Sequence, residues 1–171
     1  MTRPVHLSIL LLPLLLGPLS PARAADACDA LTARMIRATG ASLAGRTGTL
    51  AVFRAADAER MSLTCGKPPR MVFSALAREP AYPFYALIGQ AAQALTGAKA
   101  EAVEALALAL HQEALLTGSP RQGVAGRAAL RCETAPDADP FATPRTRCIL
   151  IPDPKLVLRR RAGLFADARA G

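Results

Sequence analysis

The residues of this chain that could form bonds with one another or bind a metal together are its four cysteines, Cys28, Cys65, Cys132 and Cys148. An even number of cysteines in an exported chain predicts two disulfides, for which three pairings are open. The cysteines form no C-x-x-C pair, and His111 is the one histidine beyond residue 24. A redox-active dithiol or a zinc site is therefore disfavoured, because a reactive thiol needs a cationic setting and zinc needs clustered ligands.

Local patterns around the cysteines favour one of the three pairings. Residues 126–133 alternate with the period of two that is typical of a half-buried strand, and a second apolar segment begins at Cys148. An antiparallel pair of these strands would place Cys132 within bonding reach of Cys148. Cys28 and Cys65 then pair by elimination, which ties the first helix to the sheet. In the chain-entropy model the shorter loop contributes about 3 kcal/mol and the longer one about 4 kcal/mol.

The sequence lacks most of the residue combinations that known catalytic sites use. A Ser-His-Asp or Cys-His arrangement would have to use His111, which lies on a predicted helix where such a histidine is usually a surface or half-buried packing residue. Asp137 and Asp139 lie in a Pro-rich connection and are better explained as turn residues than as an acid–base pair. No nucleophile elbow, H-E-x-x-H or phosphate-binding glycine motif occurs. The sequence predicts no catalytic residue, metal ligand or cofactor-binding residue.

Two segments remain as candidate partner-binding elements. Phe141 lies in the Pro- and Asp-rich connection 134–144, which a disulfide between the last two cysteines would close into a constrained loop. Constraint lowers the entropy lost on binding, although Phe141 could instead cover the edge of the sheet. Near the C-terminus, Arg159, Arg160 and Arg161 stand beside apolar residues. Such a segment could lie on an anionic membrane surface or be solvated.

The N-terminal residues 1–24 have the pattern of a secretory signal peptide. Arg3 precedes an apolar run over 7–16, and the small-x-small sequence 22–24 supplies a cleavage site. The run is too short to cross a bilayer, which takes about 20 apolar residues. Acylation of Cys28 is disfavoured, because it would leave an odd number of cysteines. We therefore predict a periplasmic or secreted protein that begins after cleavage at Ala24.

Composition narrows the classes of partner. The net charge is +8, and removing Arg3 and Arg23 from the 21 basic residues leaves 19 against 13 acidic ones, or +6. Arginine far outnumbers lysine and alanine is abundant, which suggests a GC-rich bacterial genome. Aromatic residues make up 4% of the chain and tryptophan is absent. Since aromatic platforms stack sugars and unpaired bases, their scarcity counts against lectin-like proteins and proteins that bind single-stranded nucleic acids.

The expected elements follow the order helix, three strands, two helices, two strands. Asp26 or Asp29 would cap the first helix, which ends at Gly40. The remaining elements are expected over residues 47–54, 60–65, 70–76, 83–97, 98–116, 126–133 and 148–151. Segregated strands and helices predict an α+β fold: a small antiparallel sheet of about five strands, with an N-terminal helix and a central helical pair packed on one face.

The sequence thus predicts one α+β domain over residues 25–154, followed by a basic tail over 155–171 that we expect to be disordered. It favours an exported protein that is not an enzyme and binds a protein partner, for example as an envelope accessory factor. The alternatives are a periplasmic hydrolase without a recognisable motif, and a module that binds anionic surfaces through its Arg-rich tail. A deep pocket of titratable groups would favour the first alternative, and a continuous basic patch across the domain the second.

We expect no cofactor, no nucleic-acid partner and no transmembrane segment after signal cleavage. Peripheral membrane contact, the oligomeric state and the identity of the partner stay open at this point.

Overall fold

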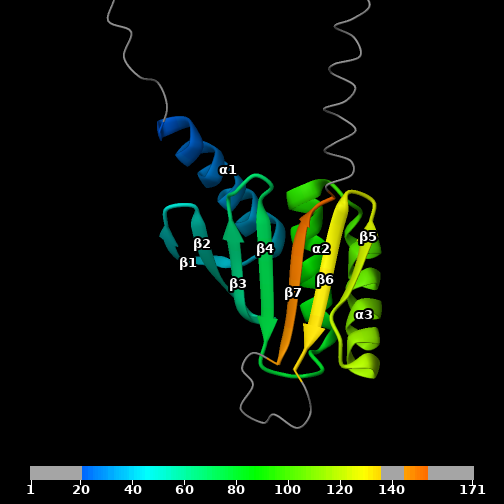
Figure 1. The fold of residues 1–171 in the computed structure, drawn as a ribbon. Helices are drawn as coiled ribbons and strands as arrows, with labels where there is room; N and C mark the ends of the chain where they lie inside the picture. The colour runs from blue at the N-terminus through cyan, green and yellow to red at the C-terminus, as the bar shows by residue number, and fades with distance from the viewer. Residues whose placement is uncertain (1–20, 136–144, 154–171) are drawn as a thin grey trace, which may run out of the picture.

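In the computed structural model, residues 21–135 and 145–153 form three helices and one seven-stranded antiparallel sheet (Figure 1). The elements are α1 (Pro21–Thr39), β1 (Ser42–Thr47), β2 (Leu50–Ala55), β3 (Ala58–Thr64), β4 (Arg70–Ala75), α2 (Tyr82–Thr96), α3 (Ala100–Thr117), β5 (Arg121–Ala125), β6 (Ala128–Thr134) and β7 (Thr146–Pro152). The strand order is β1-β2-β3-β4-β7-β6-β5. The chain therefore builds one half of the sheet from its edge inward, crosses through α2 and α3, and builds the other half inward from the opposite edge.

The α+β class is confirmed, but the predicted number of about five strands is wrong. The structure adds the two edge strands, β1 and β5. Almost every residue of β1 is exposed, so the strand has no apolar alternation to reveal it. The strand predicted over 47–54 in fact contains the turn between β1 and β2. Similarly, Gly126, where the strand over 126–133 was expected to begin, has a φ of 58° and lies in the turn between β5 and β6.

The first helix begins earlier than the sequence predicts. α1 starts at Pro21, so neither Asp26 nor Asp29 caps it, and the helix runs through the predicted cleavage position at Ala24. Proline is well tolerated at a first helical position, and the alanine-rich residues that follow have high helix propensity.

The two central helices end where glycine follows them. Gly97 and Gly118 adopt positive φ angles of 74° and 61°. Their N–H groups donate to carbonyl oxygens four residues earlier, at 2.9 Å in both cases. A third glycine, Gly89, permits close packing of α2 on α3, because a Cβ there would lie 2.5 Å from the carbonyl oxygen of Ala100.

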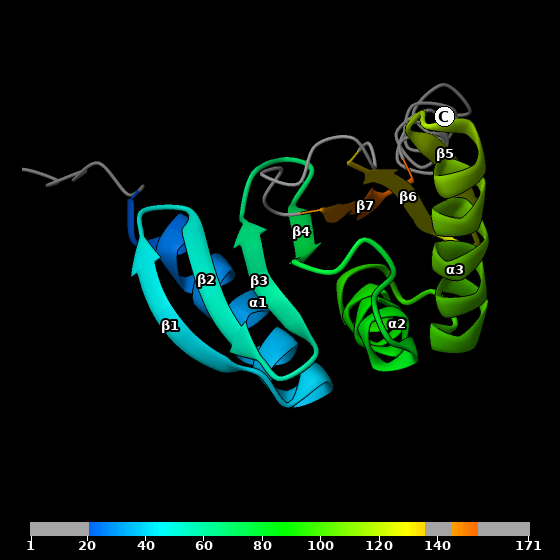
Figure 2. The same ribbon diagram turned by 90° about the horizontal axis from the view of Figure 1, so that it is seen from below.

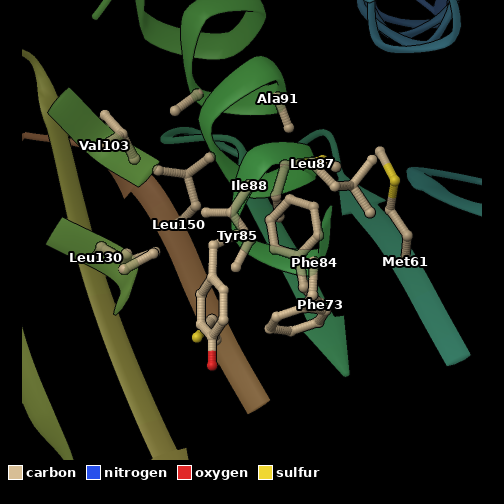
Figure 3. Packing of buried hydrophobic residues seen from close by; sticks show 14 of the residues in the cluster. Met61, Phe73, Phe84, Tyr85, Leu87, Ile88, Ala91, Val103, Leu130 and Leu150 are labelled. Atoms are coloured by element: carbon tan, nitrogen blue, oxygen red, sulfur yellow. The ribbon is translucent and has the colours of Figure 1, made fainter. Parts of the chain in front are cut away.

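All three helices lie on the same side of the sheet, which curves around them (Figures 1 and 2). The sheet side chains that point toward the helices are fully buried and pack against α2 and α3 (Figure 3). The labelled members of this core are Met61, Phe73, Leu130 and Leu150 from the strands and Phe84, Tyr85, Leu87, Ile88, Ala91 and Val103 from the helices. Burial of this apolar surface is the main stabilising term of the fold.

Two disulfides form in the pairing that the sequence predicts. Cys132 and Cys148 are register partners on β6 and β7, with their Cα atoms 4.2 Å apart. Cys28 on α1 bonds Cys65, which follows β3, with the Cα atoms 5.6 Å apart. The first bond lies within the sheet and the second attaches a helix to it.

Within residues 21–135 and 145–153, none of the helices is both long enough and apolar enough for a membrane span.

Candidate functional site

The face of the sheet turned away from the helices carries the candidate site, which we call the open face. Side chains alternate along each strand, so that Met71 and Phe73 are buried against the helices while Val72 between them points outward and is half-buried. One outward row crosses the sheet from β2 to β5 through successive register partners: Val52, Ser62, Val72, Ile149, Arg131 and Gln122.

The centre of the open face is apolar. Val72 and Ile149 are cross-strand partners on the two central strands, β4 and β7. Ile151 faces Ala129 in the neighbouring row, and Ala129 faces Val124, whose exposed fraction is 54%. These small and β-branched side chains form a low apolar strip rather than protruding anchors.

Four arginines, Arg60, Arg70, Arg131 and Arg147, surround this strip. The carboxylate of Glu133 lies 3.5 Å from Nη2 of Arg131 and 3.5 Å from Nη1 of Arg147. The contact with Arg131 is exposed and the one with Arg147 is partly buried, and at 3.5 Å each contributes about 1 kcal/mol or less. Among residues 21–135 and 145–153, Arg60 and Arg70 make neither an ion pair nor a hydrogen bond, and both side chains are exposed.

Two shallow hollows lie on the open face. One of about 610 Å³ is bordered by Arg60 and Arg147 and has Val72 in its floor. The other, of about 690 Å³, is bordered by Arg70 and includes Ile149 in its lining. Since Val72 and Ile149 are register partners, the hollows adjoin each other along the middle of the sheet. Glu59 in the first and Asp153 in the second are their acidic residues.

The open face resembles a binding surface more than a catalytic centre. Its polar groups are mostly guanidinium and hydroxyl groups, and its carboxylates are dispersed, with Glu59 in one hollow and Asp153 in the other. In the described part of the chain, no cluster of three or more histidine, cysteine, aspartate or glutamate residues could hold a metal ion. What the surface offers is apolar contact flanked by groups that bind carboxylates or phosphates in a bidentate manner.

His111, which was expected on the surface or half-buried, is instead 2% exposed. Its ring lies 5.6 Å from that of Tyr85, and neither ring nitrogen has a hydrogen-bond partner within the described ranges. Burial lowers the pKa of His111, while the charge of Glu79 opposes and that of Arg78 reinforces this shift. Burial, together with the charge of Glu79, raises the pKa of Tyr85 to about 12. Both rings are therefore neutral at pH 7 and serve as packing groups.

The partner-binding residues predicted from the sequence do not contribute to this description. Phe141 and Arg159, Arg160 and Arg161 lie outside residues 21–135 and 145–153. Sequence reasoning also missed the open face. Its signal was present in the alternation of Arg60, Ser62 and Thr64 with buried residues, but alternation alone does not tell whether the polar side is covered.

In comparisons with known proteins, no family model matches the chain, and neither a curated protein nor a solved structure shows significant similarity to it.

Proposed function

We propose that this chain is an exported, disulfide-bonded domain that binds a protein partner through the open face of its sheet and catalyses no reaction. The predicted signal peptide and the two disulfides support export, since such bonds persist in oxidising compartments. The proposed destination is the periplasm or the outside of the cell.

The observation that carries this proposal is a sheet face with an apolar centre that none of the helices within residues 21–135 covers. In a two-layer α+β domain, the sheet can leave one face to water, and that face is then normally polar. Here Val72, Ile149 and Ile151 stand in the middle of it instead. Exposed apolar strips with a polar rim are typical of surfaces that bind another protein.

The Arg-rich surface module remains the weaker interpretation. A continuous basic patch would favour it, but the apolar strip separates Arg60 and Arg147 from Arg70, and Glu133 contacts both Arg131 and Arg147. The central side chains of the strip, Val72, Ile149 and Ile151, are half-buried and do not project far enough to insert into a bilayer.

The proposal can be tested by photo-crosslinking in cells of the source organism. A photoreactive amino acid would replace Ser62 or Val124 on the open face and, in a control, the exposed Gln112 on α3. We expect a protein adduct from the two open-face positions and none from Gln112. Equal adducts from all three positions, or none from the open face, would reject the proposal.

Export is tested on the same material. Mass analysis of the isolated protein should show an N-terminus at Ala25 and no free thiols. An intact N-terminus with four free thiols would contradict it.

A further inference from the structure

We propose that the partner presents an extended acidic segment to the open face, with two carboxylates that Arg60 and Arg70 bind on either side of the apolar strip. This inference rests on the proposed function of the face and adds the chemical class of its partner.

Arg60 and Arg70 are the two arginines beside the apolar strip that have no partner among residues 21–135 and 145–153. The carboxylate of Glu133 already contacts Arg131 and Arg147. Arg60 and Arg70 are exposed, and in the part of the chain that the structure describes they have no carboxylate or carbonyl within bonding distance. A guanidinium group binds a carboxylate through two parallel hydrogen bonds, so each of these side chains offers a bidentate site.

The register sets the spacing between the two sites. Arg60 on β3 is opposite Ser74, and Arg70 on β4 is opposite Thr64, so the arginines stand at opposite ends of the β3–β4 pair. Ser74, the partner of Arg60, is four residues from Arg70 on β4. The backbone positions of Arg60 and Arg70 are therefore about 14 Å apart. In an extended partner, residues i and i+4 point to the same side and are about 13 Å apart. Two carboxylates with this spacing could reach both arginines, with an apolar residue over Val72 between them.

The size of the face favours a segment over a whole domain. The region bounded by the arginines extends about 13 Å along the strands and, over the three spacings from β3 to β6, about 14 Å across them. Its area of roughly 190 Å² is well below the approximately 800 Å² per partner of a standard interface between folded proteins.

Charge disfavours the C-terminal tail of the chain as the occupant. Lys155 and the arginines at 159–161 have the same sign as Arg60 and Arg70. The acidic surface of α3, with Glu101, Glu104 and Glu113, has the complementary sign. A second copy of the chain is therefore the main competing occupant, and the experiment includes its signature.

The experiment selects random twelve-residue displayed peptides on the oxidised protein and measures the binding of the enriched peptides by titration. The variants are Arg60→Gln and Arg70→Gln, and a double variant that combines Ile149→Thr with Ile151→Thr. The control is Arg37→Gln at an exposed position of α1. We expect enriched peptides with Asp or Glu pairs at i and i+4. Each of the two arginine variants should bind them about tenfold more weakly, since a hydrogen bond to a charged group is worth about that factor. Arg37→Gln should leave binding unchanged.

The outcomes separate this inference from the proposed function. Peptides that need Ile149 and Ile151 but show no acidic bias would overturn the inference and leave the binding face intact. Peptides that depend on neither the isoleucines nor the arginines would overturn both. Arginine-dependent binding to phosphatidylglycerol vesicles without acidic-peptide binding would overturn the inference in favour of a membrane. If sedimentation showed that the protein dimerises and that dimerisation requires Arg60 and Arg70, the inference would be overturned in favour of a second copy of the chain.

Discussion

The two faces of the sheet come from the same strands, yet they have opposite chemistry. On β4, Met71 and Phe73 are fully buried against the helices, while Val72 between them is half-exposed. The covered face uses large, flexible or aromatic side chains that fill space between layers. The open face uses small β-branched side chains bordered by arginine. The comparison shows that the same alternation can stabilise the fold on one side and leave a binding surface on the other.

The largest expected effect comes from a pair of alanine substitutions at adjacent positions, which compares the two faces directly. Phe73→Ala removes a fully buried ring and should lower the free energy of unfolding by about 3–5 kcal/mol. Val72→Ala removes a half-exposed side chain and should cost about 1 kcal/mol or less. Urea unfolding followed by circular dichroism measures both. Similar losses would mean that the open face is covered in the folded protein.

A smaller effect is expected from the disulfide that lies on the covered face. Replacing both Cys132 and Cys148 by alanine frees a loop of 16 residues, and the free energy of unfolding should fall by about 3 kcal/mol. The matched variant of Cys28 and Cys65, whose separation is 37 residues, should lose about 4 kcal/mol by the same model. Thermal unfolding of the two oxidised variants measures the difference. A negligible loss for either pair would show that its bond does not constrain the unfolded chain.

The smallest effect concerns the pH dependence contributed by His111. Burial lowers its pKa in the folded state, so only the unfolded chain gains a proton as the pH falls below about 6.5. Stability is therefore complete above that pH and decreases below it, by at most about 1.4 kcal/mol per pH unit for a single proton. Glu79 and Arg78 act on the ring in opposite directions and do not reverse the sign.

The control for this prediction is His111→Phe, which keeps a ring against Tyr85 and cannot titrate. Urea midpoints at pH 7.5 and 5.5 should diverge more in the original protein than in the variant. Identical pH profiles would mean that the imidazole finds a proton acceptor when it is charged.

Local sequence patterns predicted the elements that carry strong local signals. Glycine at the helix ends and alternation in β3 and β4 identify their elements without knowledge of the rest of the chain. The disulfide between Cys132 and Cys148 followed from the same reasoning, because a strand pair brings register partners within bonding distance. Edge strands such as β1 escaped prediction, since neither of their faces is buried enough to impose a pattern.

By itself, the sequence determined which side chains alternate along β3 and β4 and which cysteines can bond, because both depend on short-range periodicity and chain geometry. Only the tertiary structure decided which side of the sheet the helices cover. That choice depends on how α2 and α3 fold back after β4, and it converts Val72, Ile149 and the surrounding arginines from scattered outward residues into one surface.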